Sequence, residues 1–208
     1  NEAALVFGGN GKSANTESWN GSSWTETGDL NSAKRQFAGS FGTPDSSSDL
    51  LVSGAFPRTA NVEIWDGSSW TETSNLNQSR SDGAGIGVSS TAGLVAGGQS
   101  SPSPIPGQTA YAENWNGSSW TEVAELNTNR MNLAAAGEQT SGLLMGGNTD
   151  PGNSTTTEIW NGSSWTELND LSTGVAANSG GGSSVAAISF GGSTPTITGA
   201  SEEFTAAL

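Results

Sequence analysis

The hexapeptide WNGSSW occurs at residues 19–24, 115–120 and 160–165, and its variant WDGSSW occurs at residues 65–70. Asn-Gly and Asp-Gly supply the positive-φ residues of a two-residue type I′ turn, so each copy is expected to form a β-hairpin. In that register Trp19 pairs with Ser22. Glu17 then pairs with Trp24, which places both indoles and one carboxylate on the same face. The four copies contain every tryptophan of the chain: Trp19, Trp24, Trp65, Trp70, Trp115, Trp120, Trp160 and Trp165.

A longer repeat surrounds each hairpin. An apolar run ending in small residues precedes it at 4–9, 50–54, 94–98, 143–147 and 185–192, and segments of small residues occur at 37–41, 84–88 and 133–137. Short apolar runs bounded by glycine are typical of buried strands. The first tryptophans are 46, 50 and 45 residues apart, and 44 more residues lead to Phe204. A unit of four antiparallel strands and roughly 45 residues predicts an all-β protein, with each unit a blade of a β-propeller.

The units span approximately 1–30, 31–76, 77–126, 127–171 and 172–208, which together predict a single domain of five blades. The first unit has no inner strand and the fifth has no outer strand, so we expect three-stranded blades at the seam. A four-bladed ring with a free tail, or part of a larger ring, are the alternatives. The third unit is longer because of an insertion, Gln99 to Ala110, whose prolines predict a loop. We expect the indoles to pack against successive neighbours in a closed circle.

The repeat resembles the kelch repeat, in which a Gly-Gly pair follows an apolar strand and two aromatic residues follow later. It reads here as Leu144-Met145-Gly146-Gly147, then Trp160 and Trp165, and the resemblance covers essentially the whole chain. The chain departs from it in using Trp for the usual first Tyr, in a slightly shorter interval to the second Trp, and in Gly54-Ala55 for one Gly-Gly pair. The repeats are also similar to those of proteins predicted in marine bacteria and their phages. The resemblance implies a propeller, most often of six or seven blades.

A glutamate precedes the first aromatic of each hairpin by two residues and should not be buried without a partner. We expect it to be structural, and its partners to be backbone N–H groups of the neighbouring blade or a basic residue, Lys34, Arg80 or Arg130. The fourth position of that basic series is Val175. The glutamates are Glu17, Glu63, Glu113 and Glu158.

Composition excludes several functions. The chain has 20 acidic and 6 basic residues and a formal net charge of −14, so nucleic acid is not an expected partner. It has no Cys and no His, which removes disulfides, thiol chemistry, imidazole bases and most zinc sites. No apolar run approaches the ~18 residues of a membrane helix, so no membrane insertion is expected. We expect no cofactor and no metal. Asn1 suggests a processed product, an excised fragment or part of a longer chain.

Known propeller enzymes do not fit these residues. Copper radical oxidases of the galactose oxidase type need His, Tyr and Cys, and Tyr111 is the only tyrosine here. Sialidases carry an Asp-box turn that residues 66–70 match with one residue too few, and the chain has no arginine cluster for a sugar carboxylate. The 20 acidic residues allow many carboxylate pairs, but nothing singles out one at glycosidase spacing. We therefore expect no enzymatic activity, with a glycoside hydrolase the least favoured alternative.

The connections from the second to the third strand of each unit vary most, and they should emerge on one face. Uniform blades with variable loops indicate a scaffold for a binding surface. The least turn-like loop residues are the candidate ligand contacts: Phe56, Arg58, Ile105, Tyr111 and Asp150. We expect a recognition module for a glycan or a protein, extracellular or on a virion surface, as in phage or cell-surface attachment. The alternative is a structural part of an extracellular or virion assembly, self-associating through the edge strands of incomplete blades.

Overall fold

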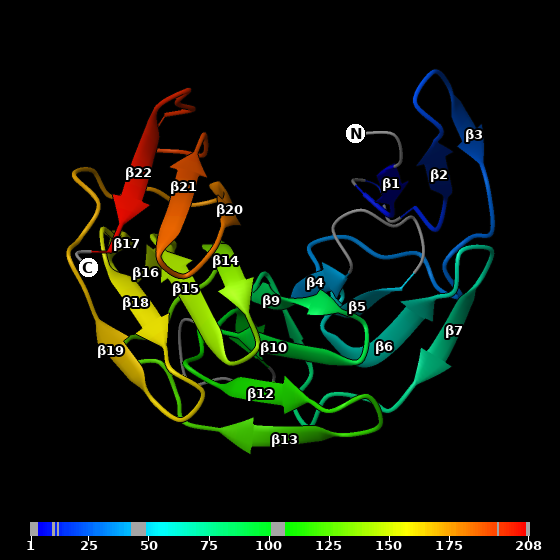
Figure 1. The fold of residues 1–208 in the computed structure, drawn as a ribbon, viewed down its shortest axis with the longest axis horizontal. Coiled ribbons are helices and arrows are strands. Elements are labelled where there is room, and N and C mark those ends of the chain that lie inside the picture. Colours follow the sequence, from blue (N-terminus) through cyan, green and yellow to red (C-terminus); the bar gives the residue numbers. More distant parts are fainter. Residues whose placement is uncertain are drawn as a thin grey trace.

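The computed structural model describes residues 4–9, 11, 13–42, 49–100, 107–194 and 196–206, and these form strands and turns without a helix. Five small antiparallel sheets follow one another as the blades of a β-propeller (Figure 1). The predicted all-β class and the number of blades are confirmed. In the part of the chain that is described, no helix is long and apolar enough to span a membrane.

Within the described ranges, three blades have four strands, and the first and last have three. Blade 1 contains β1 (Ala4–Phe7), β2 (Thr16–Trp19) and β3 (Trp24–Glu26). Blade 2 contains β4 (Gly39–Gly42), β5 (Leu50–Ala55), β6 (Thr59–Trp65) and β7 (Trp70–Thr73). Blade 3 contains β9 (Ala84–Ser89), β10 (Ala92–Ala96), β12 (Ala112–Trp115) and β13 (Trp120–Val123). Blade 4 contains β14 (Ala134–Glu138), β15 (Ser141–Met145), β18 (Thr157–Trp160) and β19 (Trp165–Glu167). Blade 5 contains β20 (Ser179–Gly182), β21 (Ala186–Phe190) and β22 (Ser201–Thr205).

Short strands lie in the connections. β8 (Arg80–Ser81) follows blade 2 and pairs with β11 (Gln99–Ser100) of the insertion in blade 3. The prediction of a loop was therefore wrong for the first two residues of that insertion. The prolines begin at Pro102 and do not remove the N–H groups that these two residues need for pairing. β16 (Asn148–Thr149) and β17 (Gly152–Asn153) form a small hairpin in the connection between the second and third strands of blade 4.

The hairpin register differs from the predicted one. Trp19 pairs with Trp24 and Glu17 with Glu26, so four residues, not two, form the turn. The cause is Asn20, whose Oδ1 accepts the backbone N–H groups of Ser22 and Ser23, both at 3.0 Å. This Asx turn needs a positive φ only at Gly21, where φ is 94°. The same turn recurs in the other three hairpins, and each pair of indoles still shares one face.

The core lies between successive blades. Leu94 of blade 3 packs in one buried cluster with Trp160 and Trp165 of blade 4, and equivalent clusters fill the other three junctions. The second tryptophan also bonds to the preceding blade, because the Trp165 indole N–H donates to the Ala124 carbonyl at 3.0 Å. The six tryptophans of blades 2, 3 and 4 are at most 7% exposed. Burial of an indole is worth up to roughly 4–6 kcal/mol at ~25 cal/mol per Å².

The inner strands β4, β9, β14 and β20 lie side by side near the centre, where small residues are needed. A Cβ atom at Gly85 would lie 2.6 Å from the Ser40 nitrogen of blade 2. The side chain therefore cannot be larger than hydrogen at this point without moving a backbone. The small-residue segments of the sequence mark these strands for that reason.

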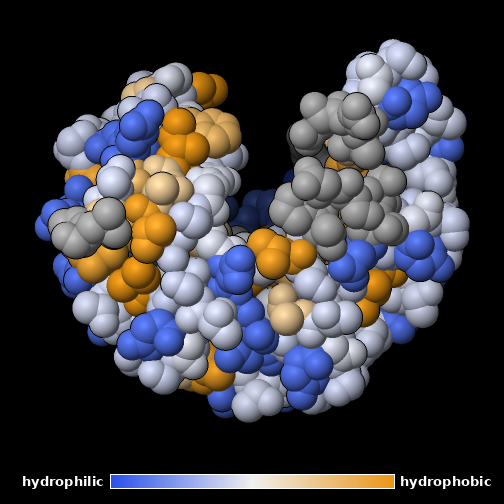
Figure 2. All heavy atoms as spheres, in the orientation of Figure 1, coloured by the Kyte–Doolittle hydropathy of each residue, from blue (hydrophilic) through white to orange (hydrophobic). Residues whose placement is uncertain are grey.

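The ring of blades is open between blade 1 and blade 5 (Figures 1 and 2). On blade 1 the open face exposes Val6 by 53% and Trp24 by 47%, and on blade 5 it exposes Ile188 by 37% and Phe190 by 47%. The expectation of a closed circle was therefore wrong. Repeat spacing determines the number of strands in a blade, but it does not determine the rotation between blades, which decides whether five blades close.

Candidate functional site

At three of the four junctions between blades, a buried glutamate carboxylate accepts hydrogen bonds from the segment that connects it to the preceding blade. Glu63, Glu113 and Glu158 are all 0% exposed. At the junction of blades 3 and 4, Glu158 Oε2 accepts the backbone and side-chain N–H groups of Asn127, at 2.9 and 2.7 Å. The other oxygen, Oε1, accepts from Arg130 Nη2 at 2.7 Å. Each connection therefore closes the junction with an Asn and a cation.

The other two junctions repeat this arrangement. Glu63 bonds to Asn31 and Lys34, and Glu113 bonds to Asn77 and Arg80. Both predicted kinds of partner, a backbone N–H group of the neighbouring blade and a cation, are present at these three junctions. The asparagine side chains were not predicted, although each asparagine follows a leucine in the series Leu-Asn-x-x-Lys/Arg, which begins at Leu30, Leu76 and Leu126. Within the described residues no blade packs before blade 1, and the Glu17 carboxylate makes no hydrogen bond there.

The buried arginines also bind backbone oxygens. Arg130 Nη1 donates to the carbonyls of Gly146 and Thr156, at 2.8 and 2.7 Å, and Arg80 Nη1 donates to the Tyr111 carbonyl at 2.9 Å. Burial lowers the pKa of both guanidinium groups, and the facing glutamate opposes that shift. The arginines are charged partners that hold two blades together, because a buried carboxylate requires such a partner.

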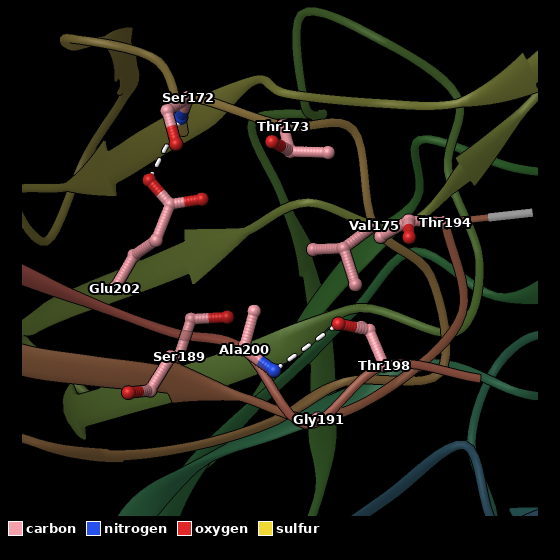
Figure 3. Close-up of a pocket in the computed structure, with 10 residues that line it drawn as sticks. Ser172, Thr173, Val175, Ser189, Gly191, Thr194, Thr198, Ala200 and Glu202 are labelled. Carbon is pink, nitrogen blue, oxygen red and sulfur yellow. Dashed lines mark hydrogen bonds between the residues drawn. The ribbon is translucent and has the colours of Figure 1, made fainter. Parts of the chain in front are cut away.

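The junction of blades 4 and 5 lacks the cation and contains a cavity of about 310 Å³. Its connection reads Leu171-Ser172-Thr173-Gly174-Val175, so serine replaces the asparagine and valine replaces the cation. The Ser172 N–H still donates to Glu202 Oε2 at 2.8 Å. Figure 3 shows the second oxygen of Glu202 pointing toward Val175 across the cavity. Within the described residues this oxygen has no hydrogen bond, so the cavity carries an unpaired carboxylate oxygen.

The variable loops lie on the same side of the blades as this cavity. In an antiparallel blade, the connection from the second to the third strand and the one to the next blade leave from the same end. We call this side the loop face. The β21–β22 connection contributes Thr194 and Thr198 to the cavity wall (Figure 3). The cavity therefore lies at the loop face.

Neighbouring loops are bonded to one another across the loop face. Arg58 Nη2 of blade 2 donates to Gln99 Oε1 of blade 3 at 2.6 Å. Gln108 Nε2 of blade 3 donates to Asn148 Oδ1 of blade 4 at 3.0 Å. Asn153 Nδ2 of blade 4 donates to the Ser193 carbonyl of blade 5 at 2.5 Å. These bonds hold the loops of blades 2 to 5 in one continuous surface.

The predicted ligand contacts are placed separately on this surface. Phe56 is half-buried, with the Arg35 guanidinium 4.7 Å from its ring centroid, and Arg58 is exposed and joined to Gln99. Tyr111 is 36% exposed in blade 3, and Asp150 is exposed in the turn between β16 and β17. In the part of the chain that is described, no hydrogen bond or ion pair joins Tyr111 or Asp150 to the Phe56–Arg58 loop. Ile105 lies outside the described residues.

The residues that line the cavity were not predicted as a site from the sequence. The available signal was Val175, which breaks the series of cations, together with Ser172, which breaks the series of asparagines.

No group of three or more acidic, His or Cys side chains in the described ranges could hold a metal ion. Comparison with known proteins finds no family model and no curated protein that matches this chain.

Proposed function

We propose that this protein is a non-enzymatic recognition module that binds a glycan or a protein through its loop face, in an extracellular setting or on a virion surface. The observation that carries the proposal is the contrast between repeated blade junctions and individual loops. Three junctions use the same Glu, Asn and cation, while the loops differ in length and in exposed side chains. The setting that we propose rests on the resemblance, drawn from the sequence alone, of the repeats to those of proteins predicted in marine bacteria and their phages.

A glycan array with matched variants tests this proposal. We expect binding by the unmodified protein and its loss in F56A/R58A, which removes one half-buried and one exposed side chain from the loop face. S163A, in the blade 4 hairpin on the opposite face, should bind normally, because its side chain only supports a local turn. A panel of immobilised cell-surface proteins forms the second arm. Absence of binding in both arms, or equal loss in S163A, would contradict the proposal.

The open faces support a second function, assembly through head-to-tail contact between copies. Ile188 on blade 5 occupies the position of Leu94, which packs on Trp160 and Trp165 inside the molecule. Trp24 on blade 1 occupies the position of Trp165. The two exposed faces are thus the two halves of a blade junction, and a contact between them is heterologous. We propose that the blade 5 face of one copy packs on the blade 1 face of another.

Mass measurement in solution at several concentrations tests this assembly. The unmodified protein should form species larger than a dimer at high concentration, and W24S or I188S alone should be monomeric. A mixture of W24S and I188S should form dimers only, because each variant retains one of the two complementary faces. I197S is the control, since Ile197 is 94% exposed in a loop and belongs to neither face. A monomeric unmodified protein at every concentration would exclude this function.

A further inference from the structure

The cavity between blades 4 and 5 occupies the space that an arginine side chain fills at the preceding junction. At that junction the Arg130 guanidinium has three acceptors in blade 4: the Gly146 carbonyl, the Thr156 carbonyl and Glu158 Oε1. A guanidinium group is planar and carries its donors in a fixed fork, so this set of acceptors is specific for its shape as well as its charge.

Blade 5 retains the same three acceptor positions. Glu202 corresponds to Glu158, because each accepts the backbone N–H of its connection, at 2.8 and 2.9 Å. Gly191 corresponds to Gly146, and Ala200 corresponds to Thr156. In blade 5 the Gly191 N–H donates to the Ala200 carbonyl at 2.9 Å, and in blade 4 the Gly146 N–H donates to the Thr156 carbonyl at 3.0 Å. All three residues line the cavity (Figure 3).

Only the side chain that would use these acceptors is missing. Val175 stands at the position of Arg130 and ends short of Glu202, which leaves the carboxylate oxygen facing open space (Figure 3). We propose that this cavity binds a guanidinium group supplied by a ligand of the loop face, in the way that the chain's own arginine binds at the junction before it. This inference rests on the proposed recognition function and specifies a ligand with an exposed arginine-like group.

Size, access and charge agree with this assignment. A volume of about 310 Å³ lies at the lower end of the range for ligand pockets and fits one extended side chain. Thr194 and Thr198 of the β21–β22 loop lie at the cavity, so a group can enter from the loop face (Figure 3). The formal net charge of −14 attracts cations, and a carboxylate with carbonyl oxygens would repel an anion. The cavity therefore selects a cation with several N–H donors.

Titration with N-acetyl-arginine amide, followed by backbone amide shifts, tests the inference. We expect saturable shifts at Ser172, Gly191 and Glu202, with affinity in the millimolar range, as for a single side chain of few atoms. N-acetyl-citrulline amide has nearly the same shape without the charge and should bind about tenfold more weakly or worse. Equal binding of the two probes, or no shift at these amides with either, would overturn the assignment.

Two variants separate occupancy of the cavity from general effects. V175R supplies an internal guanidinium and should abolish probe binding while it raises the melting temperature. E202Q removes the charge but leaves an acceptor for the Ser172 N–H, and should weaken probe binding about tenfold. V175L, which adds apolar volume alone, should not raise the melting temperature as V175R does. Undiminished probe binding in a folded V175R or in E202Q would contradict the assignment.

Failure of the guanidinium assignment and failure of the proposed recognition function give different results. Arginine-specific binding in the cavity without any glycan or protein ligand on the arrays would support the pocket assignment and contradict the recognition role. A loop-face ligand whose binding is unchanged in V175R would support recognition and overturn the guanidinium assignment.

Discussion

Glu113 is completely buried and accepts hydrogen bonds from Asn77 and Arg80 of the preceding blade, so its charge is part of the junction. A buried ion pair contributes little beyond its desolvation cost when both members are present, but loss of one member leaves a buried charge unpaired. The effect of a substitution therefore depends on whether the partner remains. Glu17 has the same place in its hairpin but is exposed.

We expect E113Q to lower the stability of the fold, because Arg80 would remain buried without a counter-charge. The cost of breaking such a pair is about 3–5 kcal/mol, which corresponds to roughly 10 °C in melting temperature for a chain of this size. E17Q is the matched control and should melt as the unmodified protein does. Thermal unfolding followed by circular dichroism measures both. An unchanged melting temperature for E113Q would show that the pair does not stabilise the junction.

Asp82 differs from Glu113, because its charge at neutral pH lowers the stability of the fold. It has φ of 58° in the connection that follows blade 2, where blade 3 has Asn132 with φ of 54°. Burial raises the pKa of Asp82, with the Ser81 hydroxyl, Gln36, Arg58 and Arg35 opposing that shift. A carboxyl whose pKa is raised on folding stabilises the protein below its unfolded pKa and loses that contribution as the pH rises through the folded value. At neutral pH the charged form is therefore a cost.

We expect D82N to raise the melting temperature at pH 7 by about 2 °C or more, since asparagine also favours a left-handed conformation and carries no charge. The gain should disappear at about pH 3, below the ordinary aspartate pKa of ~3.9, where this carboxyl is protonated in both the folded and the unfolded protein. Melting curves at the two pH values measure the difference. A D82N variant that is less stable at pH 7, or equally shifted at both pH values, would refute this prediction.

The hairpin is the element that the sequence specifies most directly. Asn20 and Gly21 predicted a reversal of the chain at the right place, because a side-chain acceptor followed by glycine favours a turn in either form. The exact turn was not predictable from the two-residue rule, since the Asn side chain accepts two N–H groups and lengthens the loop. Packing of Trp19 against Trp24 directly across the strands then follows from the longer turn.

The hairpin of blade 2 has Asp66 where the other three have asparagine, and this gives it a pH dependence of its own. The Ser69 and Ser68 N–H groups hold the pKa of Asp66 at about 2. A lowered pKa stabilises the folded hairpin above the unfolded value near ~3.9, and that contribution is lost as the pH falls through the folded value.

We expect the Ser68 and Ser69 amide shifts to titrate with a midpoint at pH about 2 in the unmodified protein. In D66N these amides should not titrate, because the neutral side chain makes the same turn in the other hairpins. Nuclear magnetic resonance between neutral pH and the acid limit of the fold gives the midpoint. A midpoint at the ordinary aspartate value would show that the turn bonds do not hold this carboxylate.

The blade-to-blade series could be predicted in its repeated parts and not in its exceptions. Trp115, Trp120 and Glu113 recur at fixed positions, so their shared face and its burial follow from the repeat. The role of Asn77 needed the geometry, because a backbone N–H and an amide N–H meet one oxygen only in the folded junction. The cavity beside Val175 also needed it, since a missing cation shows in the sequence but the space it leaves does not.

At the scale of the whole molecule, the blades form a one-dimensional series in which each contacts its neighbours. In such a series the end units have one neighbour and the middle units have two. Among the residues that the structure describes, blade 1 has no inner strand and has an exposed Trp24, while blade 3 is buried between blades 2 and 4. Local stability should therefore fall from the middle of the series toward its ends.

Hydrogen exchange measured by mass spectrometry tests this gradient. Amides of β1 to β3 and β20 to β22 should exchange faster than those of β9 to β15, because fewer buried contacts oppose their opening. V175R should slow exchange in blade 5 alone, while the conservative V175L should not. Equal protection across all five blades would contradict the view that each blade depends on its neighbours.

The most direct test of the whole arrangement is the solvent accessibility of the tryptophans. In monomeric protein labelled with 5-fluorotryptophan, a soluble paramagnetic agent should broaden the fluorine resonance of Trp24 strongly, with W24F providing its assignment. The resonances of Trp65, Trp70, Trp115, Trp120, Trp160 and Trp165 should stay sharp, since these side chains are buried between blades. Broadening of these six resonances as well, or protection of Trp24 in the monomer, would contradict a series of blades that is packed inside and open at its first face.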